Sequence, residues 1–158
     1  MGQISLDATD RRMLRLLQAN GRMTNQELSE RVGLSPSPCL RRLRRLEGAG
    51  VIRGYSARVD QKAYGLPVTV FVSVRLTRQN EEEIAAFEQA VAGWDEVSAC
   101  YLMTGTQDYL LHVVGEGIEA YERFVKTRLT RLKCIAAIES NFVMGIVKEG
   151  AVFPEVTG

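Results

Sequence analysis

The chain has 158 residues, 46% of them hydrophobic and 25% charged, which is the balance of an ordinary globular protein. This length suits one domain or two small ones. No apolar run is long enough to cross a bilayer, and the first residues lack the apolar core of a signal peptide, so we expect a cytoplasmic protein. Three widely spaced cysteines argue against a disulfide framework or a zinc site.

The formal net charge of +1 hides an uneven distribution. Residues 1–65 hold 12 Lys and Arg against 6 Asp and Glu, a net of +6, whereas residues 66–158 hold 8 against 13, a net of −5. A basic module joined to an acidic one suggests that the basic part binds a polyanion, although such a charge can also be a solvated surface.

The first half of the sequence predicts three short helices. Asp7 is a suitable N-cap for a helix that stops near Gly21. Thr24 and Glu27 have the spacing of a capping box at the start of the second helix. Gly33 is well placed to end that helix in a left-handed conformation and turn the chain sharply.

The third helix is predicted in "LSPSPCLRRLRRLEGAG", residues 34–50. Ser35 is a good N-cap, and the two prolines fall in the first turn, where backbone N–H groups have no helical partner. Leu40, Leu43 and Leu46 span an arc of roughly 120° on one side of a helix. Four arginines (Arg41, Arg42, Arg44 and Arg45) fall around the other side, with no acid among them before Glu47.

This arrangement indicates a helix-turn-helix. A structural helix normally interleaves acids with its basic residues, whereas guanidinium groups alone match phosphates and guanine edges. A capped basic helix after a glycine turn is typical of a recognition helix in the DNA major groove. Residues 50–60 then suit a wing. The alternative is a solvated basic helix in a three-helix domain.

The second half predicts the order β-α-β-β-α-β. Residues 68–76 alternate between valines or leucine and other residues, as expected of a strand with one buried face. The other predicted elements are a helix at 81–94, strands at 96–105 and 107–115, a helix at 118–132 and a strand at 135–148. This is the ferredoxin-like split unit, an antiparallel sheet with both helices on one face, so the predicted fold class is α+β.

The opposite face of this sheet carries apolar residues such as Phe71, Tyr101 or Leu102, and Val143. An uncovered apolar face usually marks an association surface, so we expect a homodimer formed sheet to sheet. The predicted domains are a winged helix-turn-helix at 1–60, a linker at 61–67 and the ferredoxin-like domain at 68–158.

The chain resembles the Lrp/AsnC family, the leucine-responsive and asparagine-responsive bacterial transcription regulators. The matching stretches are "LDATDRRMLRLLQANGRMTNQELSERVGLSPSPCLRRLRRLE", "VIRGYSA", "MTGTQDYLL" and "IESNFVMGIVK", which together cover nearly the whole chain. "LSPSPCLRRLRRLE" is especially similar to the leucine-responsive branch. The resemblance implies binding to double-stranded DNA, assembly of homodimers into octamers or similar rings, and an amino-acid effector held between dimers.

The resemblance also implies which residues do this. Residues 25–44 match the family's helix-turn-helix, and phosphate contacts are expected from the serines and first-turn N–H groups. The candidate DNA-binding residues are Thr24, Asn25, Ser35, Ser37, Pro38, Arg41, Arg42, Arg44 and Arg45.

In the family, a strand end, a turn of pattern G-D-x-D-Y-L and part of the last strand form the effector region. The candidate effector residues are therefore Leu102, Met103, Thr104, Gly105, Thr106, Gln107, Asp108, Tyr109, Ile118, Asn141, Phe142 and Val143. Thr106 and Gln107 depart from the pattern, because the first acid of the turn is missing. Asp108 and backbone carbonyls could accept from an effector's ammonium group, but Asp108 could equally cap the turn. Apolar neighbours favour an effector like leucine or methionine.

Nothing in the sequence indicates catalysis, a cofactor or a metal. His112, the only histidine, has no Cys, Asp or Glu nearby in ligand spacing, and Cys39 suits a packed thiol better than a redox switch. We predict a regulator, not an enzyme, whose DNA binding responds to an amino acid. The alternatives are a nucleoid-associated protein that compacts DNA with little sequence preference, and a regulator that senses another class of ligand.

Overall fold

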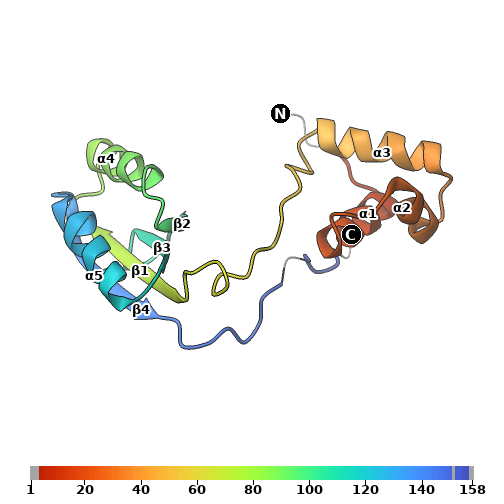
Figure 1. Cartoon of the computed structure of the whole chain (residues 1–158). Helices are drawn as coiled ribbons and strands as arrows, with labels where there is room; N and C mark the ends of the chain where they lie inside the picture. The colour runs from red at the N-terminus through yellow and green to blue at the C-terminus, as the bar shows by residue number, and fades with distance from the viewer. Residues whose placement is uncertain (1–3, 151, 157–158) are drawn as a thin grey trace. The chain divides into compact units, whose positions relative to one another are not determined.

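The computed structural model describes residues 4–150 and 152–156 (Figure 1). It divides the chain into two units, each with its own core. The N-terminal unit contains the described residues up to Arg58 together with those from Val147 onwards. The C-terminal unit is Val59–Ile146.

The N-terminal unit is built on α1 (Ala8–Ala19), α2 (Asn25–Val32) and α3 (Pro36–Gly48). The predicted caps of α1 and α2 are confirmed, and both are reciprocal capping boxes. Asp7 accepts from the Asp10 N–H at 2.7 Å, and the Asp10 carboxylate accepts from the Asp7 N–H at 3.2 Å. Thr24 and Glu27 bond in the same way at the start of α2. These boxes satisfy N–H groups that the first helical turn leaves free.

The turn between α2 and α3 is also as predicted. Gly33 adopts a φ of 74°, the left-handed region that glycine enters at little cost, and it ends α2. Ser35 is the N-cap of α3 and Pro36 its first residue. Within the described residues, however, the Ser35 side chain makes no capping hydrogen bond, so this hydroxyl is not used by the helix.

The core of the N-terminal unit is small. It contains Met13 and Leu17 of α1, Leu28 of α2 and Cys39 of α3, with partly buried Leu43 and Ile52 against them. Burial raises the pKa of the Cys39 thiol. The predicted packed role of this cysteine is therefore confirmed. Residues 53–60, expected to be part of a wing, contain no regular strand among the described residues.

The C-terminal unit confirms the predicted β-α-β-β-α-β order. It contains β1 (Val68–Leu76), α4 (Glu81–Ala92), β2 (Val97–Leu102), β3 (Tyr109–Gly115), α5 (Ile118–Thr127), a short 3₁₀ helix (Leu129–Arg131) and β4 (Ile135–Phe142). In the described part of the chain, the strands form one antiparallel sheet in the order β2-β3-β1-β4.

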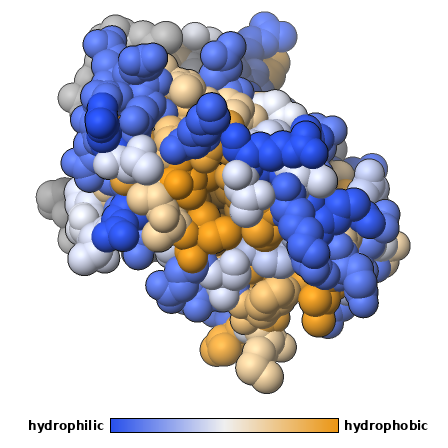
Figure 2. Space-filling view, turned by 90° about the vertical axis from the view of Figure 1, so that its left-hand side faces the viewer, coloured by the Kyte–Doolittle hydropathy of each residue, from blue (hydrophilic) through white to orange (hydrophobic). Residues whose placement is uncertain are grey.

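One face of this sheet packs against both helices (Figure 1). Val70, Val72 and Val74 of β1 point into this layer, where they meet Phe87 of α4 and Phe124 of α5. The alternation predicted from the sequence therefore holds, because every second residue from Val70 to Leu76 is buried. Apolar residues also reach the surface of this unit, and Figure 2 shows a patch of them in the middle of one face, bordered by hydrophilic residues.

The end of the chain departs from the expected boundaries. β4 stops at Phe142, although the sequence pattern extended this strand to residue 148. The described residues from Val147 onwards group with the N-terminal unit, whereas the predicted second domain at 68–158 includes them. Ion pairs account for part of this: Glu149 lies 3.3 Å from Arg58, and Glu155 lies 2.5 Å from Arg15.

Candidate nucleic-acid interface and ligand region

The orientation of α3 decides which of its side chains can reach a ligand. Cys39 and Leu46 are fully buried, and Leu40 and Leu43 are both half-buried, with Leu43 packed against the core cluster. The buried side of the helix is therefore centred on Cys39, Leu43 and Leu46, roughly 30° from the centre of the arc predicted through Leu40, Leu43 and Leu46. This orientation brings Arg42 and Arg45 toward α1.

Arg42 and Arg45 both bind acids of the α1 N-terminus. One Arg42 nitrogen lies 2.6 Å from Asp7 and 2.9 Å from Asp10, and one Arg45 nitrogen lies 2.5 Å from Asp10. The Asp10 side chain is completely buried, so its charge is compensated by the two guanidinium groups and by the Asp7 N–H. The four arginines of α3 are thus not equivalent, and two of them join α3 to α1.

The ion pairs also affect proton binding. The hydrogen bond from the Asp10 N–H, followed by the one from Arg42, lowers the pKa of Asp7. The same contact with Asp7, followed by the one with Asp10, raises the pKa of Arg42. Both shifts favour the charged forms of Asp7 and Arg42.

Arg41 and Arg44 form the outward side of α3. Both are exposed, and no acid lies within 4 Å of either one among the described residues. Ser37 is exposed as well, and its spacing of four and seven residues places it on the same side of the helix. This side presents two free guanidinium groups and a hydroxyl near the helix N-terminus, which together suit an anionic partner.

The remaining DNA-binding candidates have local structural roles. The Thr24 hydroxyl bonds the Glu27 carboxylate at 2.8 Å, and the Asn25 amide donates to the Pro36 carbonyl at 2.9 Å, which fixes the turn between α2 and α3. The Asn25 side-chain oxygen is buried and has no partner in the described structure. Ser35 is exposed and Pro38 is half-buried in the first turn of α3.

The turn between β2 and β3 contains most of the candidate effector residues. Thr104, Gly105 and Thr106 are exposed, and Gly105 has a φ of 116°, in the region that favours glycine. Leu102 and Met103 are exposed apolar residues at its start. Gln107 is half-buried.

Asp108 is bound within this turn. It is nearly buried, and its carboxylate accepts from the Leu76 N–H at 2.7 Å and from the Gln79 side chain at 2.6 Å. Its backbone also bonds Val74 and Met103. The carboxylate therefore secures the end of β1 to the turn, which is the capping role that the sequence left open beside effector binding.

Tyr109 lies inside the core rather than at the surface. Its ring packs on Phe87 at a centroid distance of 4.5 Å, and its hydroxyl donates to Glu88 at 2.8 Å. Burial, and to a lesser degree this hydrogen bond, raises the pKa of Tyr109. The Tyr109 side chain is therefore a core contact that stabilises the neighbouring β2-β3 turn.

The last four effector candidates lie at the end of the sheet away from the β2-β3 turn. They are Ile118, Asn141, Phe142 and Val143. Leu102 neighbours Tyr109, which pairs with Val74 near the end of β1, whereas Phe142 pairs with Val70 and Val143 bonds Thr69 near its start. Ile118 begins α5, just beyond the same end of β3. Two sets of candidates therefore occupy opposite ends of the sheet and do not meet within one chain.

The sheet face without helices has an aromatic centre. Phe71 of β1 stacks on His112 of β3 at a centroid distance of 5.0 Å, and the His112 Nδ1 lies 2.6 Å from the Ser98 hydroxyl. Tyr101 of β2 is 54% exposed and Phe71 is 37% exposed. Phe142 belongs to the opposite face, because its ring contacts Tyr121 of α5.

The part of the chain that the structure describes offers no cluster of metal ligands. No group of three or more His, Cys, Asp and Glu side chains there could hold a metal ion. Among helices of the same residues, none is long and apolar enough to cross a membrane.

Three features were not found from the sequence. The sequence predicts Asp7 as an N-cap only, whereas the structure shows that Asp7 and Asp10 also bind arginines of α3. Gln79 has no sequence signal as a partner of Asp108. The packing of residues 152–156 on the N-terminal unit was also missed, because these residues were attributed to the second domain.

Comparisons with known proteins agree with both units. Residues 69–153 match a family described as the Lrp/AsnC ligand binding domain, and residues 6–53 match one described as winged helix-turn-helix DNA-binding. The leucine-responsive regulatory protein of Rhizobium meliloti is 40% identical, over 93% of this chain and 94% of its own. The Bkd operon transcriptional regulator of Pseudomonas aeruginosa is 40% identical, over 88% and 91%.

Solved structures give the same result. A transcriptional regulator of Neisseria meningitidis, solved as a complex with L-Met, is 40% identical with a TM-score of 0.90, covering 95% of this chain and 97% of that one. An AsnC family transcriptional regulator of Agrobacterium tumefaciens is 37% identical with a TM-score of 0.89, covering 94% and 97%.

Proposed function

This chain belongs to the Lrp/AsnC family of transcriptional regulators, and we propose that it binds DNA as a homodimer through the outward side of α3. The observation that carries this proposal is the division of the α3 arginines. Arg41 and Arg44 are free for a polyanion, whereas Arg42 and Arg45 are bound to α1. With Ser37 and the first-turn N–H groups on phosphate, this side of the helix would lie in the major groove.

The sheet face without helices is the proposed dimer surface. Phe71, Tyr101 and Val143 would be covered there by the same residues of a second copy, as a twofold interface requires. Such a dimer presents two α3 helices, which fit successive major grooves if they lie about 34 Å apart. We propose that dimers assemble further into octamers or similar rings and that the protein acts at the nucleoid in the cytoplasm.

The effector region is proposed to form between copies. The β2-β3 turn and the set made by Ile118, Phe142 and Val143 lie at opposite ends of the sheet, so only a second copy can bring them together. Exposed apolar side chains in both sets suit an aliphatic or thioether side chain. The N. meningitidis relative was solved with L-Met, which supports an effector like methionine or leucine here.

The turn supplies the polar contacts of this site. Backbone N–H groups near Gly105 can bind the effector carboxylate. Asp108 already accepts from Leu76 and Gln79, so Thr104, Thr106, Gln107 and backbone carbonyls are the better acceptors for the ammonium group. Effector binding would shift the assembly equilibrium, and hence DNA affinity, by no more than its differential affinity for the assembly states.

The experiment is fluorescence anisotropy of DNA from upstream of the protein's own gene, near 150 mM salt, with scrambled DNA and a panel of amino acids. We expect a preference for the upstream DNA that one amino acid changes. Equal weak binding to both DNAs would favour a compacting protein. A preference that no amino acid changes would favour another class of ligand. The relatives named above are regulators, and we propose no catalytic role.

Substitutions of Asp108 separate its two possible roles. Removing the carboxylate in Asp108→Ala leaves the buried Leu76 N–H without its acceptor, which should lower the stability of the C-terminal unit by about 1–3 kcal/mol. Asp108→Asn retains an acceptor and should keep both the fold and the amino-acid response. Thermal unfolding and the anisotropy assay test this. Loss of the response in a fully stable Asp108→Asn protein would show that the charge binds the effector directly.

A further inference from the structure

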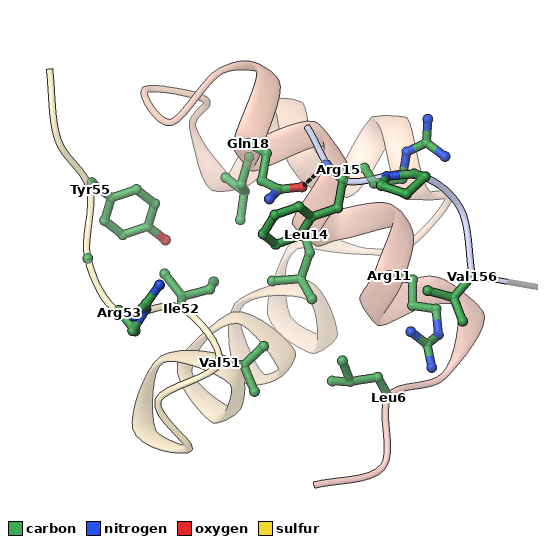
Figure 3. Close-up of a pocket in the computed structure, with 14 residues that line it drawn as sticks. Leu6, Arg11, Leu14, Arg15, Gln18, Val51, Ile52, Arg53, Tyr55 and Val156 are labelled. Atoms are coloured by element: carbon green, nitrogen blue, oxygen red, sulfur yellow. Dashed lines mark hydrogen bonds between the residues drawn. The ribbon is translucent and has the colours of Figure 1, made fainter. Parts of the chain in front are cut away.

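The N-terminal unit has an apolar groove beside α1. Its apolar lining comes from Leu6, from Leu14 and Leu17 of α1, and from Val51 and Ile52 after α3, and it encloses about 540 Å³. Figure 3 shows Leu14 between Val51 and Ile52 on one side and Leu6 on the other. Phe153, Pro154 and Val156 line the same space, so this volume is what remains open beside the C-terminal segment.

Residues 152–156 lie on this groove. The Phe153 N–H donates to the Gln18 side chain at 3.1 Å, and Glu155 pairs with Arg15 at 2.5 Å. Phe153, Pro154 and Val156 form part of the groove wall. Arg11, Arg15 and Arg53 line the same groove, so its charge is complementary to the acid of this segment.

These contacts are incomplete. Phe153 is 73% exposed and Val156 is 61% exposed, and the ion pair is at the surface, so each contact is weak. The chain connection compensates for this, because a short tether gives a segment an effective concentration of about 1 mM. If the free segment bound with a dissociation constant of about 0.1 mM, the tethered one would occupy the groove for roughly nine-tenths of the time.

We propose that this groove is a docking site for an aromatic-proline-acid segment, and that its occupant is the chain's own residues 152–156, acting as a reversible strap. The strap follows β4, which ends at Phe142 among the candidate effector residues, and it docks on α1. The N-terminus of α1 in turn carries Asp7 and Asp10, which bind Arg42 and Arg45 of α3. The strap therefore connects β4 to the recognition helix by a path that is separate from the linker at 61–67.

The docking itself is tested without DNA or effector. A fluorescein-labelled peptide of residues 147–158 is titrated with the full chain and with a chain that ends at Gly150, and anisotropy reports binding. The shortened chain should bind the peptide, whereas the full chain should bind it about ten-fold more weakly, because its own segment competes. A peptide with Phe153→Ala should lose binding. The matched control, Val152→Ala, should keep it, since Val152 does not line the groove.

A second variant covers the case in which the shortened chain does not fold. The full chain with Phe153→Ala and Glu155→Ala keeps its length but weakens the strap, so it should bind the wild-type peptide more tightly than the unmodified chain does. The proposal would be overturned if neither the shortened chain nor the double variant bound the peptide. It would also be overturned if these two proteins bound the peptide no more tightly than the unmodified chain does. If exclusion of the peptide disappeared on dilution, the occupant would be a second copy's segment and the strap within one chain would be wrong.

Discussion

The two units are stabilised in different ways. In the described structure the C-terminal core has fourteen buried residues, eleven of them from the sheet and two helices, whereas the main N-terminal cluster has only Met13, Leu17, Leu28 and Cys39. The N-terminal unit adds two capping boxes and the ion pairs of Asp7 and Asp10 with α3. A small core thus depends on charged contacts, and the same contacts determine which arginines remain free for DNA.

Core truncations should have the largest effect, because each one should lower the stability of one unit and leave the other unchanged. Phe87 and Leu28 are both fully buried, so we expect Phe87→Ala to cost about 3–5 kcal/mol and Leu28→Ala about 2–5 kcal/mol. Each loss should fall on one unit, so thermal unfolding followed by circular dichroism should show two transitions in each variant. A single transition that shifts equally in both variants would show that the units unfold together.

Loss of the buried acid should have the next largest effect. Asp10→Ala leaves Arg45 without its partner and Arg42 with Asp7 alone, and breaking a fully buried ion pair costs about 3–5 kcal/mol. Here the arginines are 31% and 45% exposed, so we expect a smaller loss of about 1–3 kcal/mol, confined to the N-terminal unit. Denaturant unfolding measures it. As a control, Glu139→Ala, at an exposed position in β4, should leave this unit unchanged.

Acid should weaken the N-terminal unit through its caps. Hydrogen bonds with the backbone lower the pKa of Asp7 and of Glu27 from ordinary values of 3.8 and 4.5. Their stabilisation is fully present above those values and is lost as pH falls through the lowered ones. The N-terminal melting temperature should therefore fall below about pH 4, and Asp7→Asn together with Glu27→Gln should flatten this dependence. An unchanged profile in the double variant would assign the acid sensitivity to other groups.

The sequence was sufficient for features that depend on near neighbours. The caps at Asp7 and Thr24, the glycine turn at Gly33 and the alternation of β1 follow from spacings of two to four residues, and all were confirmed. The pairing of Asp10 with Arg42 and Arg45 joins residues more than thirty positions apart, and it depends on an orientation of α3 that the leucine pattern alone does not fix.

In the ligand region, too, contacts between residues far apart in the sequence were not predicted. The glycine turn at Gly105 was predicted, but burial of Tyr109 and the bond from Gln79 to Asp108 depend on how β1, α4 and the turn pack together. The resemblance groups residues from two ends of the sheet, which only the proposed assembly of several chains would bring together. One chain therefore displays the parts of the proposed site without the site itself.

The most direct test of the account is the salt dependence of DNA affinity in two paired variants. Arg41→Ala with Arg44→Ala should lower affinity at 150 mM salt by about ten-fold or more, with no change in stability. The slope of log K against log salt should fall by about 0.9 for each phosphate that these arginines neutralise in the wild-type complex. Arg42→Ala with Arg45→Ala should lower the stability of the N-terminal unit and leave the slope of the folded protein near the wild-type value. The opposite pattern, in which only the second pair reduces the slope, would contradict the assignment of the outward arginines to DNA.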